Sequence, residues 1–509
     1  MIFRIVLLIY FIHNINAQNF ESSHLPIIII NTNGNTIEDD PKVSADMGII
    51  DNGSDLNYIT DTFNDYDGKI GIETRGDFTQ EFDKKSYGFE LWDEQGGDID
   101  ASLLGMPEEE DWILYASYLD RTFIRNVLTH EIWREFGYWS SRTRYCELVL
   151  NNEYQGIYIL MEKVKRDDNR LDIAQLGETE NDGDDLTGGY IVKMDFPEEG
   201  GWYSVFETMG SEPYYFQYEY PKENEITSEQ DEYIKQYIND FESALFSNDY
   251  FNDNGVRYDS LIDLTSFVDL FIINELSRSS DAYKGSSFIY KDKDSNDGKL
   301  RAGPIWDFNL AYGNAAWCGT DSYYGWHYKM EDPGCSDFEI MPLWWERFVQ
   351  DSVFTNTLFN RWEYLRQGPI EIDFINYRIN THINKLDNAI NRNFEKWDIL
   401  GSQLFNEPLP VPVSYDAEIN RLIDWFIYRI EWLDDEIADL IGSGDCDVGD
   451  LNQDGGYNVL DIVALANCVL ANNCSDLDGG DCASDMNGDG GFNVLDIVAL
   501  ANCVLANNC

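Results

Sequence analysis

Two aspartates stand where polar loops meet apolar segments, a pattern that could support metal or phosphate chemistry. Asp307 lies between Trp306 and Phe308 in GPIWDFNLAYGN, residues 303–314. An ionised carboxylate in apolar surroundings needs a donor or a cation as its partner. Asp281, in NELSRSSDAYKGSS, precedes a hairpin whose second strand we expect to end at Asp307. Strand pairing then brings both carboxylates to one region, where their role could be metal binding, proton transfer or purely structural.

Further polar residues could complete a site around this pair. Asn309 follows Asp307 by two positions, so in a strand both side chains would face the same side and could share a metal ion. Phosphoryl transfer needs oxygen ligands for Mg²⁺ and cations near the phosphates. Each cation taken alone could equally form a surface ion pair of little consequence. The basic residues that could face the pair are Arg75, Lys84, Lys85, Arg125, Lys163, Lys165 and Arg166.

Strand patterns dominate the first half of the chain. Short apolar or alternating segments separated by Gly, Asn and Asp are typical of strands. A helix is expected within 121–137, with Phe123, Val127, Ile132 and Trp133 near one face. A hairpin is expected in CELVLNNEYQGIYILMEKV, with its turn at residues 151–153. The segments predicted as single strands are PIIIINTN, KIGIETRG, KKSYGFELWD and DWILYAS.

Helical patterns dominate after residue 228. They are interrupted by the hairpin FIYKDKDSNDGKLRAGPIWDF, whose turn is expected at residues 296–298. Strands followed by helices predict an α+β architecture. The expected helices span 228–246, 260–278, 338–366, 370–397 and 413–441.

Composition limits the class of partner. The 509 residues exceed what one core usually organises, so we expect a large domain and at least one small one. The formal charge is 35 − 94 = −59. Such a charge argues against a nucleic-acid partner and suits cations or cationic substrates, although a solvated acidic surface is the alternative.

The N-terminal residues have the layout of a secretory signal. Arg4, an apolar segment over residues 5–12 and Ala17 predict a cleaved signal peptide at 1–17, too short to span a bilayer. No later segment is expected to span a membrane, so we predict a secreted or surface-associated protein. Nine cysteines fit an oxidising compartment. Cys318 and Cys335 could close one loop, and Cys146 is expected to be a free internal thiol.

The C-terminal end contains a duplication. NVLDIVALANCVLANNC occurs at 458–474 and again at 493–509. Each copy overlaps a twelve-residue loop, at 450–461 and 485–496, with oxygen side chains at positions 1, 3, 5, 9 and 12 and glycine at position 6. Such loops bind Ca²⁺, with a backbone carbonyl at position 7. The expected ligands are Asp450, Asn452, Asp454, Gly456, Asn458 and Asp461, and Asp485, Asn487, Asp489, Gly491, Asn493 and Asp496.

This pair of loops resembles a type I dockerin, a calcium-loop module that docks onto cohesin domains. The resemblance covers about 445–509 and implies a small all-α domain with a cohesin-like or cell-surface partner. Loop positions 10 and 11, which often carry partner contacts in that family, are Val459, Leu460, Val494 and Leu495 instead of the usual hydroxyl residues. An anchoring role is therefore a firmer expectation than cohesin itself.

The preceding region resembles the CotH kinase family over roughly 65–365. The resemblance rests on RGDFTQEFDKKSYGFEL, LLGMPEEEDWILYASYLDRTFIRN, ELVLNNEYQGIYILMEKVKRDDNRLDI, GGYIVKMD, FVDLFIINELSRSSDAYKGSSFIYKD and GPIWDFNLAYGN, in this order. It implies an atypical protein-kinase-like fold that transfers phosphate from ATP to protein serine. Asp281 matches the catalytic aspartate and Asp307 the Mg²⁺ ligand, with Asn309 beside it. The residues expected near the nucleotide are Arg75, Lys85, Arg125, Glu162 and Lys165.

The sequence thus predicts a signal peptide at 1–17, a CotH kinase-like domain at 18–442 and a dockerin-like module at 445–509. The expected function is a secreted, ATP-dependent kinase that phosphorylates serine or threonine of extracellular or surface proteins. The alternative is a surface adhesin, invasin or scaffold component that uses the kinase-like domain only for binding.

Overall fold

The chain forms two compact units, Met1–Leu433 and Asp434–Cys509. Each is described by itself. The computed structural model describes residues 20–76, 78–197, 200–210, 213–330, 335, 341–441, 449–452, 457–471, 473–474, 483–484, 486 and 491–506. The predicted signal peptide at 1–17 and the predicted boundary between the two domains, at 442–445, lie outside these residues.

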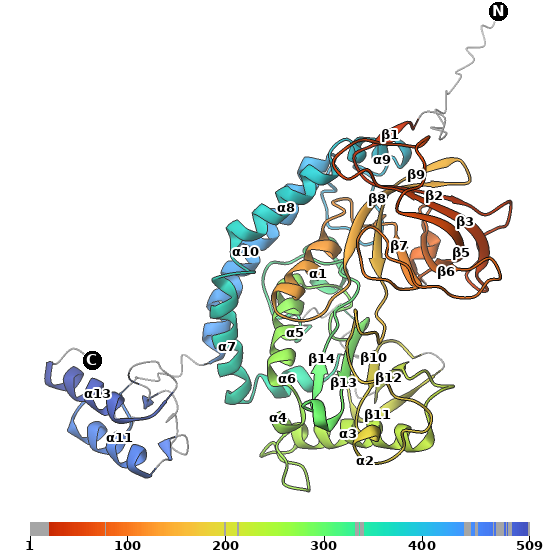
Figure 1. Ribbon diagram of the computed structural model, residues 1–509. Helices are drawn as coiled ribbons and strands as arrows, with labels where there is room; N and C mark the ends of the chain where they lie inside the picture. Colours follow the sequence, from red (N-terminus) through yellow and green to blue (C-terminus); the bar gives the residue numbers. More distant parts are fainter. Residues whose placement is uncertain are drawn as a thin grey trace, which may run out of the picture. The chain divides into compact units, whose positions relative to one another are not determined.

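Seven strands of the first unit close into a barrel in the order β2-β3-β5-β6-β7-β9-β8 (Figure 1, red to orange). All neighbours are antiparallel except β2 and β8, whose parallel pairing closes the barrel. Apolar side chains such as Ile28, Ile70 and Leu148 fill its interior. The barrel strands are β2 (Ile27–Asn31), β3 (Val43–Ile50), β5 (Tyr66–Arg75), β6 (Ser86–Trp92), β7 (Asp111–Tyr115), β8 (Thr143–Leu150) and β9 (Glu153–Glu162), and β1 (Ser22–Ser23) pairs separately with β4 (Asn57–Tyr58).

The four predicted strands and the first hairpin are confirmed in the barrel. Strand β3 was not predicted, because VSADMGII places Ser and Asp among its apolar residues and lacks a clear period. Closure was not predicted either. It depends on pairing between Ile27 and Glu147, which lie far apart in the sequence.

A second, five-stranded sheet has the order β11-β12-β10-β13-β14. It lies below the barrel in Figure 1, with helix α3 beneath it. The predicted hairpin at 288–308 is confirmed as the pair β13–β14, although its second strand ends at Ala302 and not at Asp307. The other three strands of the sheet are not among the predicted ones. The strands are β10 (Tyr190–Met194), β11 (Gly201–Glu207), β12 (Pro213–Tyr220), β13 (Ser287–Lys291) and β14 (Leu300–Ala302).

The helices follow the predicted segments with three corrections. The helix expected at 260–278 is interrupted at residues 262–263, where the Asp263 side chain accepts a hydrogen bond from the Ser266 backbone amide and begins a new helix at Leu264. The helix expected at 338–366 is two helices, because Asp351 accepts a hydrogen bond from the backbone of Val353 and begins α7 anew. The helix expected at 370–397 also breaks, at residues 387–388. The helices are α1 (Arg125–Glu135), α2 (Gly183–Leu186), α3 (Ser228–Phe246), α4 (Tyr258–Leu261), α5 (Leu264–Ser277), α6 (Trp344–Phe348), α7 (Ser352–Arg366), α8 (Ile372–Leu386), α9 (Ala389–Lys396) and α10 (Tyr415–Leu440), with short 3₁₀ turns η2 (Phe78–Glu81), η3 (Asp294–Asn296) and η4 (Trp317–Gly319).

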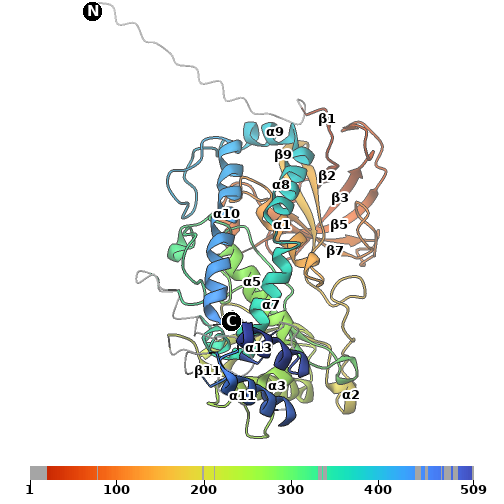
Figure 2. The same cartoon turned by 90° about the vertical axis from the view of Figure 1, so that its left-hand side faces the viewer.

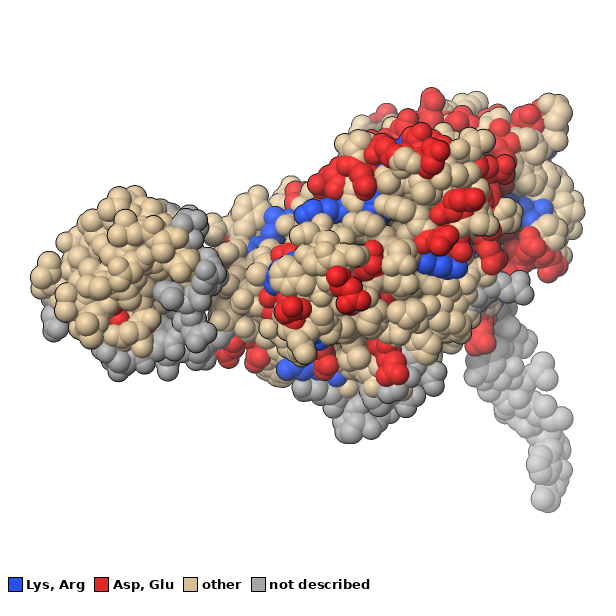
Figure 3. All heavy atoms as spheres, turned by 90° about the horizontal axis from the view of Figure 1, so that it is seen from below, with Lys and Arg blue, Asp and Glu red and all other residues tan. Residues whose placement is uncertain are grey.

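Helices α7, α8 and α10 run along one side of the first unit, seen edge-on in Figure 1 and face-on in Figure 2. Helices α1 and α5 lie behind them. None of the described helices combines the length and apolar character required to cross a membrane. Acidic side chains are spread over the face in Figure 3, whereas basic ones gather in a few groups.

Three cysteine observations bear on the predictions. Cys318 and Cys335 form a disulfide, with their Cα atoms 5.0 Å apart. Cys146 is a buried free thiol on β8. In the second unit, Cys468 pairs with Cys474. The described helices of that unit are α11 (Val459–Ala471) and α13 (Val494–Ala506); its all-α character stays a prediction.

Candidate functional site

Asp307 lies in a loop after β14, not in a strand. Strand pairing ends at Ala302, and Asp307 has a φ of 61°, in the left-handed region that aspartate tolerates better than most residues. The prediction that a strand orients Asp307 is therefore wrong. The loop is instead held by a hydrogen bond from the Phe308 amide to the Asn126 side chain, at 3.0 Å.

Asn309 nevertheless faces the same space as Asp307, although no strand aligns them. Both line a large cleft and a smaller cavity. Asn309 is buried, and its carbonyl accepts a hydrogen bond of 2.8 Å from the Asn314 side chain. That side chain also donates to the Leu119 carbonyl at 3.0 Å, so it fixes the loop against the preceding segment.

The large cleft has a volume of about 520 Å³ and contains both predicted aspartates. Asp281 reaches it from the turns after α5, and Asp307 from the loop after β14. The expected convergence of the two carboxylates is thus observed. Its other polar lining residues include Lys193, Asp195, Ser280 and Asn309, and its aromatic lining residues are Phe78, Phe196, Trp317 and Phe405.

The smaller cavity, of about 140 Å³, connects Asp307 with the barrel. Arg75, at the end of β5, and Tyr115, at the end of β7, line it. The Arg75 guanidinium lies over the Trp306 ring, 5.6 Å from its centre. Of the five residues expected near a nucleotide, Arg75 is the one that lines a cavity with Asp307. Asp307 therefore lies where the barrel meets the second sheet.

Burial and like charge raise the pKa of Asp307 to about 7. Desolvation is the largest cause, followed by the negative charge of Asp281, while Arg75 acts in the opposite direction. Asp195 adds a further repulsion. Carboxylates gathered in this way favour a bound cation, and carboxylate and amide oxygens are the ligands that Mg²⁺ prefers. The donor set of Asp307, Asn309 and the nearby Asp281 therefore fits a divalent cation.

Lys193 and Asp195 belong to this site and were missed in the sequence. The Lys193 ammonium and the Asp195 carboxylate form an ion pair of 2.6 Å at the end of β10. A methyl group built on Gly285 would lie 3.4 Å from the Asp195 carboxylate and 3.7 Å from Cβ of Asp281. The sequence feature that could have indicated them is the lysine in the apolar segment GGYIVKMD, because a strand interior rarely holds a charge without a partner.

Two predicted cations are used elsewhere. The Lys85 ammonium donates to the carbonyls of Gln80 and Phe82, so it stabilises the turn η2 beside the cleft instead of facing a nucleotide. Lys84 is buried in the barrel, where it donates to the Asn393 side chain at 3.0 Å. Burial lowers its pKa to about 7.

Arg125 is also placed differently from the prediction. It is fully buried at the start of α1, where its guanidinium contacts Asp120 at 2.7 Å and approaches Glu418 of α10 at 3.9 Å. Its neighbour Asn126 is the residue that faces the smaller cavity. The guanidinium therefore connects elements of the fold and does not reach the cleft.

Arg125→Ala should destabilise the first unit by about 3–5 kcal/mol, because Asp120 and Glu418 would lose a buried cation. Chemical denaturation measures this loss. Arg166→Ala is the matched control, since Arg166 pairs with the exposed Asp168 and should change stability by less than about 1 kcal/mol. Equal stability of the two variants would contradict the structural role of Arg125.

Glu162 and Lys165 lie in a separate charged cluster. Glu162 is buried and bound by the Arg142 guanidinium at 2.8 Å. The Lys165 ammonium contacts Glu109 at 2.9 Å and Asp111 at 3.0 Å, and also contacts Glu110. Neither residue lines the cleft or the smaller cavity at Asp307. Their nucleotide contacts stay a prediction.

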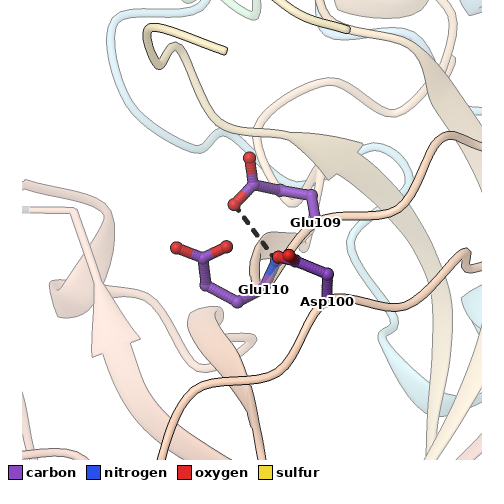
Figure 4. A group of neighbouring side chains, drawn as sticks. All are labelled: Asp100, Glu109 and Glu110. Atoms are coloured by element: carbon purple, nitrogen blue, oxygen red, sulfur yellow. Dashed lines mark hydrogen bonds between the residues drawn. The ribbon is translucent and has the colours of Figure 1, made fainter. Parts of the chain in front are cut away.

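The same cluster contains the described acidic group that comes closest to a metal-binding arrangement. Oxygens of Asp100, Glu109 and Glu110 lie within 4.8 Å of one another (Figure 4). The Lys165 ammonium already contacts Glu109 and Glu110, and the Glu110 backbone amide donates to Glu109 at 3.1 Å. The cluster is therefore a closed network of ion pairs and hydrogen bonds, unlike the cleft at Asp307.

The two calcium-loop candidates are described in part. Asp461 and Asp496 are fully buried. Asp461 accepts a hydrogen bond of 2.9 Å from the backbone amide of Asn458, and Asp496 accepts one of 2.9 Å from the backbone amide of Asn493. Asp450, at position 1 of the first loop, is also buried. Asn452 and Gly491 are described as well, whereas the predicted ligands Asp454, Gly456, Asp485, Asn487 and Asp489 lie outside the described residues.

Position 9 of each loop has a second role. The Asn458 side chain accepts a hydrogen bond from the Leu460 amide at 2.8 Å, and Asn493 accepts one from Leu495 at 2.9 Å. Each asparagine thus caps the helix that follows its loop. Position 9 often reaches calcium through water, which is compatible with this capping.

Removal of calcium should unfold the second unit, because buried Asp461 and Asp496 would face neighbouring carboxylates without a cation. Limited proteolysis of the full chain, followed by mass spectrometry, should show faster cleavage within 449–506 in excess chelator. Asp461→Asn with Asp496→Asn should give fast cleavage with and without calcium. A cleavage rate that chelator leaves unchanged in the unsubstituted chain would contradict the calcium site.

Comparison with known proteins gives two family matches. A model described as CotH kinase protein matches residues 72–433, and one described as Dockerin type I domain matches 448–505. No curated protein matches. The crystal structure of a proinflammatory kinase, CtkA of Helicobacter pylori, is similar at 10% identity, covering 69% of this chain and 94% of that one, with a TM-score of 0.24.

Proposed function

The chain belongs to the CotH kinase protein family and carries a dockerin type I tail, and we propose that it is a secreted, ATP-dependent protein kinase. It transfers phosphate to serine or threonine of extracellular or surface proteins. The observation that carries this proposal is the cleft in which Asp281, Asp307 and Asn309 meet Lys193. Oxygen ligands and a cation around one space are what phosphoryl transfer requires.

Asp307 and Asn309 hold Mg²⁺ in this proposal. The raised pKa of Asp307 supports the assignment, because a carboxylate beside Asp281 and Asp195 gains more than an isolated one from a cation. When bound, Mg²⁺ neutralises charge on the phosphates. Asn309 adds an oxygen without adding charge, so the site does not accumulate further repulsion.

Asp281 accepts or orients the proton of the acceptor hydroxyl. It lies at the cleft on a turn, half-buried, where a polypeptide can approach it. Lys193 of the second sheet and Arg75 of the barrel attract the phosphates, since each lines a space that Asp307 also lines. Lys193 is oriented by its ion pair with Asp195.

The tail attaches the enzyme to a partner in this proposal. A dockerin domain implies a cohesin-type partner, and the exposed Val459, Leu460, Val494 and Leu495 would make that contact apolar. Attachment outside the cell agrees with the predicted signal peptide. It also places the kinase next to surface proteins that could serve as acceptors.

Ligand-dependent melting of the full-length chain tests the proposal. Mg²⁺ and ATP together should raise the melting temperature, because binding at 100 times Kd stabilises a protein by about 2.7 kcal/mol. ATP without a divalent cation should raise it much less. No rise with both ligands, together with no phosphate transfer, would favour the alternative of a non-catalytic adhesin.

A further inference from the structure

A second groove opens beside the cleft. It has a volume of about 330 Å³ and lies between the end of β10, the hairpin β11–β12 and Lys284. Asp195 and Phe196 line both the groove and the cleft. The two spaces therefore meet at these residues, which separate the carboxylates of the cleft from an aromatic surface.

The groove presents aromatic side chains to solvent. Phe196 is 52% exposed and Tyr203 is 53% exposed. The Tyr203 ring packs edge-on against Tyr215, with ring centres 4.8 Å apart. Tyr214 is buried and its hydroxyl donates to the Tyr283 carbonyl at 2.7 Å, which fixes that wall. Exposed aromatic rings around a preformed hollow favour binding of an apolar group.

The groove and the proposed proton acceptor lie side by side. A methyl group built on Gly285 would be 3.6 Å from the Phe196 ring and 3.7 Å from Cβ of Asp281. The ring and the aspartate are thus separated by little more than one glycine. Consecutive Cα atoms of a polypeptide are about 3.8 Å apart. A hydroxyl at Asp281 and a side chain in the groove can therefore belong to neighbouring positions of one segment.

We propose that this groove binds the acceptor protein through a bulky apolar or aromatic side chain close in sequence to the phosphorylated residue. This inference rests on the proposed kinase function and adds a determinant of its acceptor specificity. Phe196 and Tyr203 are the specificity-determining residues. Continuity with the cleft selects the acceptor as occupant, because a ligand unrelated to the reaction would have no reason to share Asp195 and Phe196 with it.

The test uses an array of serine peptides in which each flanking position carries each amino acid in turn. Binding of the labelled full-length protein is measured first, and phosphorylation with Mg²⁺ and ATP second. Phe196→Ala with Tyr203→Ala removes the exposed rings. Tyr377→Ala is the matched control. Tyr377 is 67% exposed on α8, and no residue of that helix lines the groove.

The unsubstituted chain and the control should prefer bulky apolar residues at one or two flanking positions. The double variant should lose at least tenfold in binding to those peptides and bind alanine-containing peptides as before. Preference retained by the double variant, no apolar preference in the unsubstituted chain, or no peptide binding would overturn the groove assignment. Apolar preference in binding without phosphate transfer would support the groove and contradict the kinase function.

Discussion

Asp307→Asn should reduce phosphate transfer by about 10³-fold or more, because it removes the carboxylate proposed to hold the metal at the phosphates. The same substitution should stabilise the ligand-free protein. The pKa of Asp307 is raised to about 7, so the folded state binds this proton more tightly than the unfolded state. Stability from this group is present at low pH and is lost as pH rises from about 4 to about 7.

Melting curves of the ligand-free chain at pH 5 and pH 8 measure this effect. At pH 8 the asparagine variant should be the more stable, by on the order of 2 kcal/mol. This figure is reduced for solvent screening, because Asp307 is half-buried. The gap should shrink toward pH 5, where the carboxyl is protonated. Asp168→Asn is the control, since Asp168 is exposed and pairs with Arg166. A variant that is less stable than the parent at pH 8 would show that Asp307 is a structural carboxylate.

Asp281→Asn should lower kcat by about 10²–10⁴-fold while nucleotide binding persists, because it removes the proposed proton acceptor and leaves the proposed metal ligand Asp307 in place. The melting shift given by Mg²⁺ and ATP should therefore remain. This pattern separates Asp281 from Asp307, whose replacement should abolish both transfer and the shift.

The pH dependence of metal binding provides a second readout for Asp281. Its negative charge is the second cause, after burial, of the raised pKa of Asp307. Asp281→Asn should therefore move the midpoint of Mn²⁺ binding against pH from about 7 to a lower value. An unchanged midpoint would contradict the electrostatic coupling. Loss of the nucleotide-dependent melting shift would make Asp281 a metal ligand in addition.

The two aspartates could be found from sequence because local signals marked them. Asp307 is a charged residue within an apolar segment, and Asp281 lies in a polar segment just before a predicted hairpin. Their convergence followed from hairpin pairing, which is local. The orientation of Asp307 could not be found in this way. It depends on the hydrogen bond between Phe308 and Asn126, which are distant in the sequence.

The expected nucleotide contacts, in contrast to the two aspartates, could not be assigned from local signals in the sequence. Charge and the family resemblance together favour Arg125, Lys85 and Lys165, but burial and ion pairing decide what a charged side chain contacts. Arg125 is enclosed with Asp120, and Lys165 lies among carboxylates just before and at the start of β7. Lys193 could not be assigned to the site from the sequence, because only the folded chain brings Lys193 and its ion-pair partner Asp195 to the cleft that contains Asp281. Such assignments require the tertiary structure.

In the fold, too, local features could be predicted from the sequence and long-range pairing could not. The helix Ser228–Phe246 has the bounds that the sequence predicts, and in the structure Thr227 and Gln230 form a capping box at its start, which is a local signal. The barrel was predicted as strands but not as a closed sheet. Closure needs the parallel pairing of β2 with β8, and no local pattern encodes the partner of a strand.

We propose that this cleft transfers phosphate to protein hydroxyls. Mass spectrometry of the purified full-length chain, incubated with Mg²⁺, ATP and a mixed pool of extracellular proteins, tests it most directly beside the Asp281→Asn and Asp307→Asn variants. We expect phosphate on serine or threonine with the unsubstituted chain and its loss with either variant. Phosphate that appears equally with all three proteins, or with none, would contradict it.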